Sequence, residues 1–436
     1  MKPWENGVLK VSENRRYLVN GTQPFFWLGD TAWSLFQRLS SDEAELYLQN
    51  RKEKGFNVIQ AVLINPKDKN GKTSFQEKED CDVKEIIAED NAAYWDHVLH
   101  IVKMAEENGI YMALLPVWGK IVKEKFLNMG NYAAYADFLT RTFAGCPNII
   151  WILGGDIRGS FEFDLWDALG KKLKELNPER LIGYHPFGRT SSSYWFNDCD
   201  WLDFNMFQSG HRRYDQKFLG NWDEAAEKEP WYGEDNWRYV MADYEKKPVR
   251  PVIDGEPSYE QIPQGLHDPS EPYWQAHHVR RYAYWSVFSG AFGHTYGHNS
   301  IFQFYGTGYA QEFGAKFTWQ EALLHKGSSQ MKILKDLALE IEYFRCMPRQ
   351  ELIVNNGEKE YRNVAFGNEK NIVVYSYTGG TFALGNGPDV EYKAYWIDPC
   401  DGVKNYFGLV NLSEKNVLTP PGKENEHNDW ILLLKA

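Results

Sequence analysis

Eight apolar runs, each followed by a segment with helical periodicity, are the feature that most constrains the fold of this chain. Most of these runs are continuous rather than alternating, which is typical of parallel strands covered on both faces. We predict strands at residues 25–29, 58–64, 111–117, 149–153, 181–184, 204–207, 251–254 and 291–295. Eight strand–helix units in succession predict a closed (β/α)₈ barrel, a fold that takes about 250 residues or more.

Helical patterns fill the intervals between the predicted strands. A capping box at Ser40 and Glu43 begins one helix, which stops at Gly55. Further helices are predicted at residues 91–109, 132–143, 165–176, 273–288 and 329–346, and a short hairpin at 8–11 and 17–19 precedes the barrel. The main alternative is a doubly wound open sheet. That fold favours a glycine-rich phosphate loop after its first strand, whereas this chain reads LGDTAW there.

The pattern changes after Pro348. Short strand-like runs at 364–366, 372–377, 381–384, 392–397 and 430–434 are separated by Asn-Gly, Gly-Gly and Asp-Gly turns. They predict a small all-β sandwich. The predicted domains are therefore a barrel with its N-terminal hairpin at residues 1–347 and a sandwich at 348–436.

Composition excludes several functions. The net charge of −12, with no basic block, would repel a nucleic acid, and no apolar run reaches the ~18 residues of a membrane span. Five scattered cysteines without CxxC spacing indicate neither a zinc knuckle nor a redox motif. The 17 Trp, 26 Tyr and 25 Phe fit either a large aromatic core or surfaces that stack on sugar rings. The N-terminus has no apolar stretch like a signal peptide, which fits a cytoplasmic protein or one whose leader has been removed.

Polar and aromatic residues follow the predicted strands, where a barrel of this type carries its active site. They are Asp30, Trp33, Asn65, Trp118, Asp156, His185, Asn205, Gln208, His211, Glu256, Tyr259, His294, Tyr296 and His298. Asp156 and Glu256 come from strands four and seven, on nearly opposite sides of the barrel mouth. Two such carboxyl groups can flank a glycosidic bond, one as a protonated acid and the other ionised to attack or to activate water. The aromatic, amide and imidazole groups would bind sugar rings and hydroxyls, so the predicted partner is an oligo- or polysaccharide.

Other interpretations of the same residues remain open at this point. Asp156 and Asp30 could each cap the following helix. Glu256 could form a structural ion pair with Arg158 or Arg189. Asp254 lies two residues before Glu256, on the same side of an ideal strand, and is a rival nucleophile. The histidines are more often structural or substrate-contacting than catalytic.

Three motifs in order, LGDTAW at 28–33, WILGGD at 151–156 and DGEPSYE at 254–260, resemble the apiosidase-like barrels of the DUF4038 group, which includes glycoside hydrolase family 140. The segment AYWIDPCDG at 394–402 is similar to the sandwich that follows the barrel in that group, which is named as a collagen-binding domain of a collagenase. The resemblance implies a retaining mechanism with Asp156 as acid/base and Glu256 as nucleophile. It also implies export from the cell, no cofactor and no metal, and exo-action on side chains of pectin such as those carrying apiose.

Three further functions remain as alternatives. The barrel could be a glycosidase of other specificity, such as an endo-glucanase or a mannanase. It could be a metal-dependent hydrolase that uses the histidines, although the His-x-His expected after strand one is missing. It could also be an inactive barrel that only binds glycan. Residues 65–90 and 212–250 are where we expect substrate choice to be shaped.

Overall fold

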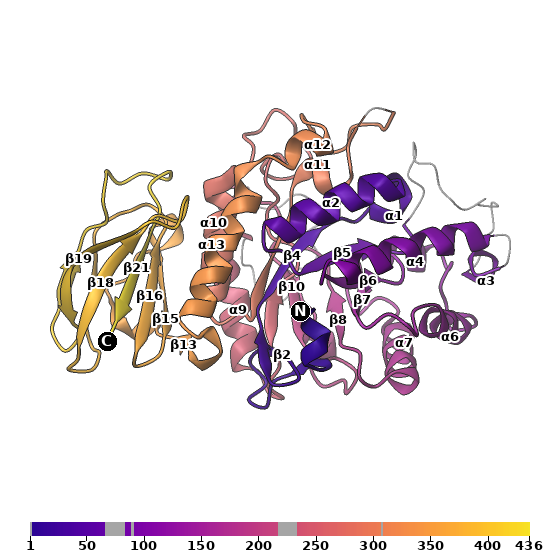
Figure 1. Ribbon diagram of the computed structural model, residues 1–436, viewed down its shortest axis with the longest axis horizontal. Coiled ribbons are helices and arrows are strands. Elements are labelled where there is room, and N and C mark those ends of the chain that lie inside the picture. Colours follow the sequence, from indigo (N-terminus) through magenta and orange to yellow (C-terminus); the bar gives the residue numbers. More distant parts are fainter. Residues whose placement is uncertain (1, 66–82, 89–90, 217–232, 307) are drawn as a thin grey trace.

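The computed structural model describes residues 2–65, 83–88, 91–216, 233–306 and 308–436. It confirms the predicted fold class: a (β/α)₈ barrel is followed by an all-β domain (Figure 1). None of the described helices combines the length and the apolar character needed to span a bilayer.

The barrel wall consists of eight strands close to the predicted positions. Parallel pairing joins β12, β4, β5, β6, β7 and β8 in that order, and β10 to β11. Contacts between β8 and β10 and between β11 and β12 complete the ring. The strands are β4 (Trp27–Thr31), β5 (Val58–Val62), β6 (Tyr111–Leu115), β7 (Ile149–Gly154), β8 (Ile182–His185), β10 (Asn205–Gln208), β11 (Val252–Asp254) and β12 (Gly293–Tyr296). All their residues are buried, as the continuous apolar runs predicted.

Helices cover the outside of the ring, and their apolar stripes face the strands. In α7, for example, Leu165, Trp166, Leu169 and Leu173 are buried. The predicted capping box is present, with the Ser40 hydroxyl accepting from the Glu43 amide at the start of α2. The helices are α1 (Leu35–Arg38), α2 (Ser41–Glu53), α3 (Val83–Ile86), α4 (Ala92–Glu107), α5 (Gly119–Lys123), α6 (Tyr132–Thr142), α7 (Phe163–Leu176), α8 (Ser193–Phe196), α9 (Asn236–Glu245), α10 (Ala276–Phe288), α11 (Asn299–Phe302), α12 (Trp319–Ala322) and α13 (Lys326–Glu340).

The N-terminal segment is a three-stranded antiparallel sheet rather than the predicted two-stranded hairpin. It comprises β1 (Leu9–Val11), β2 (Leu18–Asn20) and β3 (Gln23–Phe25). Phe25 and the preceding Trp4 both pack edge-on against Tyr111 of β6, with ring centroids 5.3 and 5.1 Å away. Tyr111 begins its strand, so this sheet covers the end of the barrel where the strands start, opposite the end that carries Asp156.

Two antiparallel sheets form the C-terminal domain. One has the order β13 (Met347–Pro348), β15 (Asn363–Gly367), β16 (Asn371–Ser376), β21 (Trp430–Lys435), β18 (Glu391–Ile397) and β19 (Lys404–Asn411). The other has the order β14 (Ile353–Val354), β17 (Phe382–Leu384) and β20 (Asn416–Leu418). An apolar cluster with members on both sheets, including Leu384, Leu418, Val374 and Leu432, confirms the predicted sandwich. The edge strand β19 was not predicted; most of its side chains, including Tyr406, Phe407 and Leu409, are exposed.

Helices α10 and α13 lie between the barrel strands and the C-terminal domain (Figure 1). Tyr284 of α10 stacks on Tyr375 of β16, with ring centroids 4.7 Å apart. The Arg280 guanidinium of α10 contacts both carboxylate oxygens of Asp429, at 2.8 and 2.6 Å, and both side chains are almost fully buried. The two domains therefore share one core and one buried, bidentate ion pair.

We expect Asp429→Ala to destabilise the protein by about 3–5 kcal/mol, because it leaves the Arg280 guanidinium buried without its partner. Unfolding in urea, followed by circular dichroism, measures the loss. Asp336→Ala is the matched control. It removes the exposed partner of Lys332 one helical turn away, and such a pair contributes about 0.3–0.5 kcal/mol. Equal effects of the two substitutions would contradict the importance of the buried pair.

Candidate active site

A pocket of about 300 Å³ opens at the carboxyl ends of the barrel strands. Asp156, which follows β7, and Glu256, which follows β11, both line it. The two strands lie on different sides of the ring, as the sequence predicted. The pocket therefore brings together two acidic groups that are 100 positions apart in the chain.

Asp156 is placed by a turn that two glycines make possible. Gly154, Gly155 and Asp156 have φ angles of 89°, 98° and 49°, all in the left-handed region that disfavours side chains with a Cβ atom. A Cβ on Gly154 would lie 2.3 Å from the His185 carbonyl oxygen, and one on Gly155 would lie 2.8 Å from the Trp118 ring. Asp156 adopts the same left-handed conformation, which is energetically unfavourable for a residue with a Cβ atom. The chain thereby leaves strand β7 at the edge of the pocket.

The helix-cap interpretation of Asp156 does not hold. The following helix, α7, begins at Phe163 and its N-cap residue is Glu162. Asp156 instead lines the pocket, where part of its surface is open to solvent. The surrounding barrel removes its carboxyl group from bulk water and so raises its pKa, and the negative charge of Glu256 raises it further. Asp156 thus retains a proton to higher pH than an ordinary aspartate.

The pKa of Glu256 is shifted in the opposite direction, because two imidazoles contact its carboxylate. His185 Nε2 lies 3.1 Å from Oε2, and His211 Nε2 lies 3.2 Å from Oε1. Only 6% of Glu256 is exposed, and burial alone would raise its pKa. The contacts with His185 and His211 outweigh burial and lower the pKa, so Glu256 is ionised where Asp156 is protonated. The contacts of Glu256 are therefore with these two imidazoles and not with Arg158 or Arg189.

The tautomer of His211 follows from its second contact. Its Nδ1 atom accepts from the backbone N–H of Tyr259 at 3.4 Å, so Nδ1 carries no proton in the neutral ring. The proton is then on Nε2, which donates to Glu256. His211 therefore orients the carboxylate through its Nε2–H group.

The two carboxyl groups are close enough to act on one bond. One oxygen of Asp156, one oxygen of Glu256 and one nitrogen of His185 all lie within 4.8 Å of one another. Of the described residues, these three could also supply a carboxylate–imidazole ligand set for a metal ion. The geometry thus fits either a carboxyl pair or a three-ligand centre.

Aromatic side chains form much of the pocket wall. Trp33 donates from its indole nitrogen to the Tyr259 hydroxyl at 3.1 Å, and its ring packs 5.3 Å from that of Trp118. Gln208 lies beside Asp156, and a hydrogen bond from Gln208 opposes the rise in the pKa of Asp156. Seven predicted residues therefore line the pocket: Trp33, Trp118, Asp156, Gln208, His211, Glu256 and Tyr259. His185 lies behind Glu256 and is completely buried.

Four predicted substrate ligands do not line the pocket. The Asp30 carboxylate pairs with Arg51 at 2.6 Å, on the helix side of the barrel wall. The Tyr296 hydroxyl donates to Glu260, and the Asn205 amide donates to Asn197 at 3.0 Å. His294 is fully buried, and burial lowers its pKa to about 3. Successive side chains of a strand point to opposite faces, so proximity to a strand end did not show which face each residue occupies.

Asp254 is likewise separate from the pocket. Strand β11 ends at Asp254, and the bend at Gly255 breaks the two-residue alternation that would have put Asp254 beside Glu256. Its carboxyl group accepts from the Ser209 hydroxyl at 2.7 Å and from the Asn236 amide at 3.2 Å, and it is fully buried. Burial raises the pKa of Asp254 to about 7. The placement favours Glu256 over Asp254 as the group that meets substrate.

One further lining residue, Asn65, follows the second predicted strand, as the sequence analysis noted. The sequence analysis did not single out the other lining residues, which are Ser34, Arg38, Lys120, Ile262, Leu266, Phe302, Gln303, Glu312 and Phe313. Four of them follow strand β12, in the loop and helix that complete the pocket. Their position after the eighth strand could have identified these residues from the sequence. In a (β/α)₈ barrel, all eight loops that follow a strand lie at the face that carries the active site. Residues 66–82 and 217–232, within the segments expected to shape substrate choice, lie outside the described residues.

Comparison with known families matches both domains. Residues 12–345 match the family described as "Apiosidase-like, catalytic domain", and residues 347–435 match "Putative collagen-binding domain of a collagenase". A solved structure described as a glycoside hydrolase is 41% identical with a TM-score of 0.92, covering 100% of this chain and 98% of its own. A glycoside hydrolase family 5 structure from Bacteroides vulgatus is also 41% identical, with a TM-score of 0.91 and coverages of 100% and 95%. No curated protein matches the chain.

We expect Gly154→Ala to cost at least about 2 kcal/mol of stability, because it adds left-handed strain and a clash with the His185 carbonyl. Thermal and urea unfolding measure the loss. Gly145→Ala is the matched control, since no atom lies within 4 Å of the added Cβ and its φ is not positive; its effect should stay within about 1 kcal/mol. A Gly154→Ala protein as stable as the control would show that the turn tolerates a side chain.

Proposed function

Because the chain belongs to the apiosidase-like family of glycoside hydrolases, we propose that it cleaves its substrate by a retaining mechanism, with Asp156 as acid/base and Glu256 as nucleophile. The observation that carries this proposal is that one carboxylate oxygen of Asp156 and one of Glu256 lie within 4.8 Å of each other, which favours the smaller of the two carboxyl separations found in glycosidases. Retaining pairs are about 5–5.5 Å apart, whereas inverting pairs leave about 6.5–9.5 Å for a water molecule.

The first step transfers the sugar to the enzyme. The ionised Glu256 carboxylate attacks the anomeric carbon and forms a glycosyl ester, while the bond from that carbon to the leaving oxygen breaks. Protonated Asp156 gives its proton to the leaving oxygen, so no alkoxide is released. The opposite pKa shifts of the two groups supply the required protonation states before substrate binds.

The second step releases the sugar. Asp156, now ionised, removes a proton from water, and the water oxygen attacks the same carbon. The ester bond to Glu256 breaks and its carboxylate returns to His185 and His211. Two displacements at one carbon leave the anomeric configuration unchanged. In this scheme the two histidines position the nucleophile and contact it as a leaving group.

We assign exo-action on a terminal sugar of a plant cell-wall glycan, such as a pectic side chain. The pocket formed by the described residues, about 300 Å³, is at the small end of the ~300–1,000 Å³ range for ligand sites and suits one terminal residue better than a long polymer. Trp33 and Trp118 offer faces for stacking on a sugar ring. A polymeric cell-wall substrate also favours a periplasmic or extracellular location.

A screen of pectic oligosaccharides, apiosides and other aryl glycosides tests the assignment. We expect NMR to show a product that first appears with the anomeric configuration of the substrate; inverted product would overturn the retaining scheme. Preferred cleavage inside glucan or mannan chains would favour an endo-acting enzyme. Binding without hydrolysis would favour a glycan-binding protein. Activity that is lost with chelator and restored by zinc would favour a metal centre at Asp156, His185 and Glu256.

Glu256→Gln should lower kcat by at least about 10⁴-fold, as expected for loss of a covalent nucleophile. Asp254→Asn is the matched control. It changes the neighbouring buried acid, which does not line the pocket, and should lower kcat by at most about tenfold. Circular dichroism confirms that both variants fold. The opposite order of effects would make Asp254 the nucleophile.

Activity should follow a bell-shaped pH profile, because catalysis requires ionised Glu256 and protonated Asp156. Activity falls at acid pH as Glu256 gains a proton, below the ordinary glutamate range because its pKa is lowered. Activity falls at alkaline pH as Asp156 loses its proton, above the ordinary aspartate range because its pKa is raised. The dependence of kcat/KM on pH reports both limits in the free enzyme.

Asp156→Asn is the control for the alkaline limit. With an activated aryl glycoside, whose leaving group needs no proton, this variant should keep measurable bond cleavage and lose the alkaline fall in kcat/KM. An unchanged alkaline limit in the variant would assign that limit to another group.

A further inference from the structure

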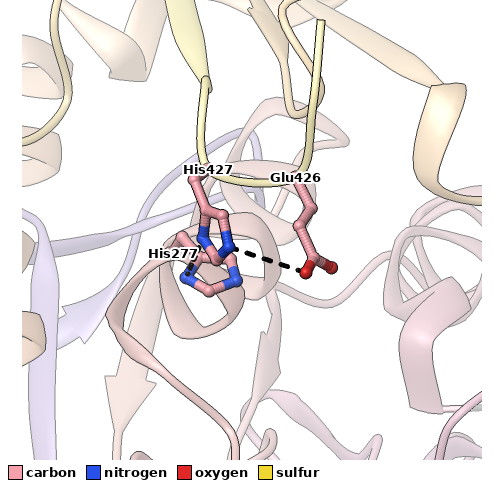
Figure 2. A group of neighbouring side chains, drawn as sticks. All are labelled: His277, Glu426 and His427. Atoms are coloured by element: carbon pink, nitrogen blue, oxygen red, sulfur yellow. Dashed lines mark hydrogen bonds and ion pairs between the residues drawn. The ribbon is translucent and has the colours of Figure 1, made fainter.

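Three side chains with metal-binding atoms meet at the junction of the two domains, away from the pocket. His277 belongs to α10 of the barrel, and Glu426 and His427 belong to the loop that precedes β21 of the C-terminal domain (Figure 2). One nitrogen from each histidine and one carboxylate oxygen all lie within 4.8 Å of one another. The cluster thus has two imidazoles and one carboxylate, contributed by both domains.

His277 is buried but incompletely satisfied. Only 7% of the residue is exposed, and its Nε2 atom has no hydrogen-bond partner among the described residues. Its Nδ1 atom lies 3.3 Å from Nδ1 of His427. The nitrogen of His277 that faces His427 is Nδ1, and it can bind a metal ion when the ring proton is on Nε2.

The distances fit a small tetrahedral ion. Zinc–nitrogen bonds are about 2.0–2.1 Å, so two tetrahedral nitrogen ligands lie about 3.4 Å apart, close to the 3.3 Å between the two Nδ1 atoms. Glu426 Oε1 lies 3.7 Å from His427 Nε2, the ring nitrogen that does not contact His277, so the exposed carboxylate must turn toward Nδ1 to join the ion. Glu426 and His427 are exposed, and the two histidines border an open surface groove that admits an ion from solvent.

The loop that carries two of the ligands is anchored at both sides. Asp429, two residues after His427, holds the buried ion pair with Arg280. The backbone N–H of Asn425 donates to the Thr378 carbonyl at 2.9 Å. The side-chain oxygen of Asn425 accepts from the backbone N–H of His427 at 2.8 Å. These contacts position the loop before an ion arrives, which lowers the entropy cost of binding.

The nearby positive charges are largely neutralised. Arg280 is paired with Asp429, and Arg281 contacts Glu234 at 2.6 Å. The neighbouring His278 accepts from the Gln275 amide through Nδ1, and its Nε2 lies 4.0 Å from Glu426. Lys326 borders the same groove and remains the main opposing charge.

We propose that His277, Glu426 and His427 bind a divalent transition-metal ion, with Zn²⁺ the best match, as a clamp between the barrel and the C-terminal domain. Two histidines and one carboxylate are an established zinc ligand set, and water would complete the tetrahedron. The site lies apart from Asp156 and Glu256, so its role is to hold the two domains together and it takes no part in bond cleavage.

Zinc binding to the full-length protein tests the proposal. The experiment uses Asp156→Asn as the parent, because the wild-type group of Asp156, His185 and Glu256 could bind zinc independently. After dialysis against micromolar zinc at pH 7.5, the parent should retain one zinc ion per chain, and its Tm should rise with zinc concentration. Cobalt in place of zinc should show the visible absorption of a tetrahedral centre.

Adding His427→Ala or Glu426→Gln should lower zinc affinity at least about tenfold and abolish the cobalt spectrum. Both residues are exposed, so these variants should fold as the parent does. Adding His100→Ala, which removes an exposed histidine of α4 outside the cluster, should change neither readout. A parent that retains no zinc, or variants that bind zinc as tightly as the parent, would overturn the proposal and leave only a hydrogen bond between two imidazoles.

Discussion

The approach of Asp156 and Glu256 to within 4.8 Å is the constraint on which the site depends. Two carboxylates this close in a poorly solvated pocket repel each other, so one proton is held between them at moderate pH. The structure decides where that proton resides. His185 and His211 contact Glu256, whereas burial and the Glu256 charge act on Asp156. This asymmetry gives the two acids different roles before any substrate arrives.

The barrel supplies this asymmetry through features that touch no substrate. The glycine turn after β7 lets the backbone pass close to the His185 carbonyl and the Trp118 ring, and so aims Asp156 at the pocket. The bend at Gly255 separates the buried Asp254 from Glu256. Outside the ring, the Asp30–Arg51 ion pair ties β4 to α2. Several polar side chains near the strand ends, such as Asp30 and Asp254, therefore stabilise the fold and do not line the pocket.

The C-terminal domain packs on α10 and α13 and shares an apolar core with them. Tyr284 stacks on Tyr375, Arg280 pairs with Asp429, and the His277–Glu426–His427 cluster spans the same boundary. Helix α10 also follows the chain segment that carries Glu256, and it is completely buried from His277 to Phe288. The sandwich thus covers one flank of the barrel and packs on the helix that follows the Glu256 segment.

The sequence by itself determined the eight barrel strands, six of the thirteen α-helices in the described residues and the order of barrel and all-β domain, because continuous apolar runs and helical periodicity are local signals of burial. It also offered Asp156 and Glu256 as the candidate acids. It could not decide which polar residues at the strand ends face the pocket. Asp30, Asn205, His294 and Tyr296 also lie near strand ends, as Trp33 and His211 do, but their side chains are buried away from the pocket, and Asp30, for example, pairs with Arg51 of α2. Only the tertiary structure sets the closure of the ring, the local bends and hence the direction of each side chain. The motif resemblance implied which acid carries the proton, but only the fold brings together the groups that shift each pKa, since they lie far apart in the chain.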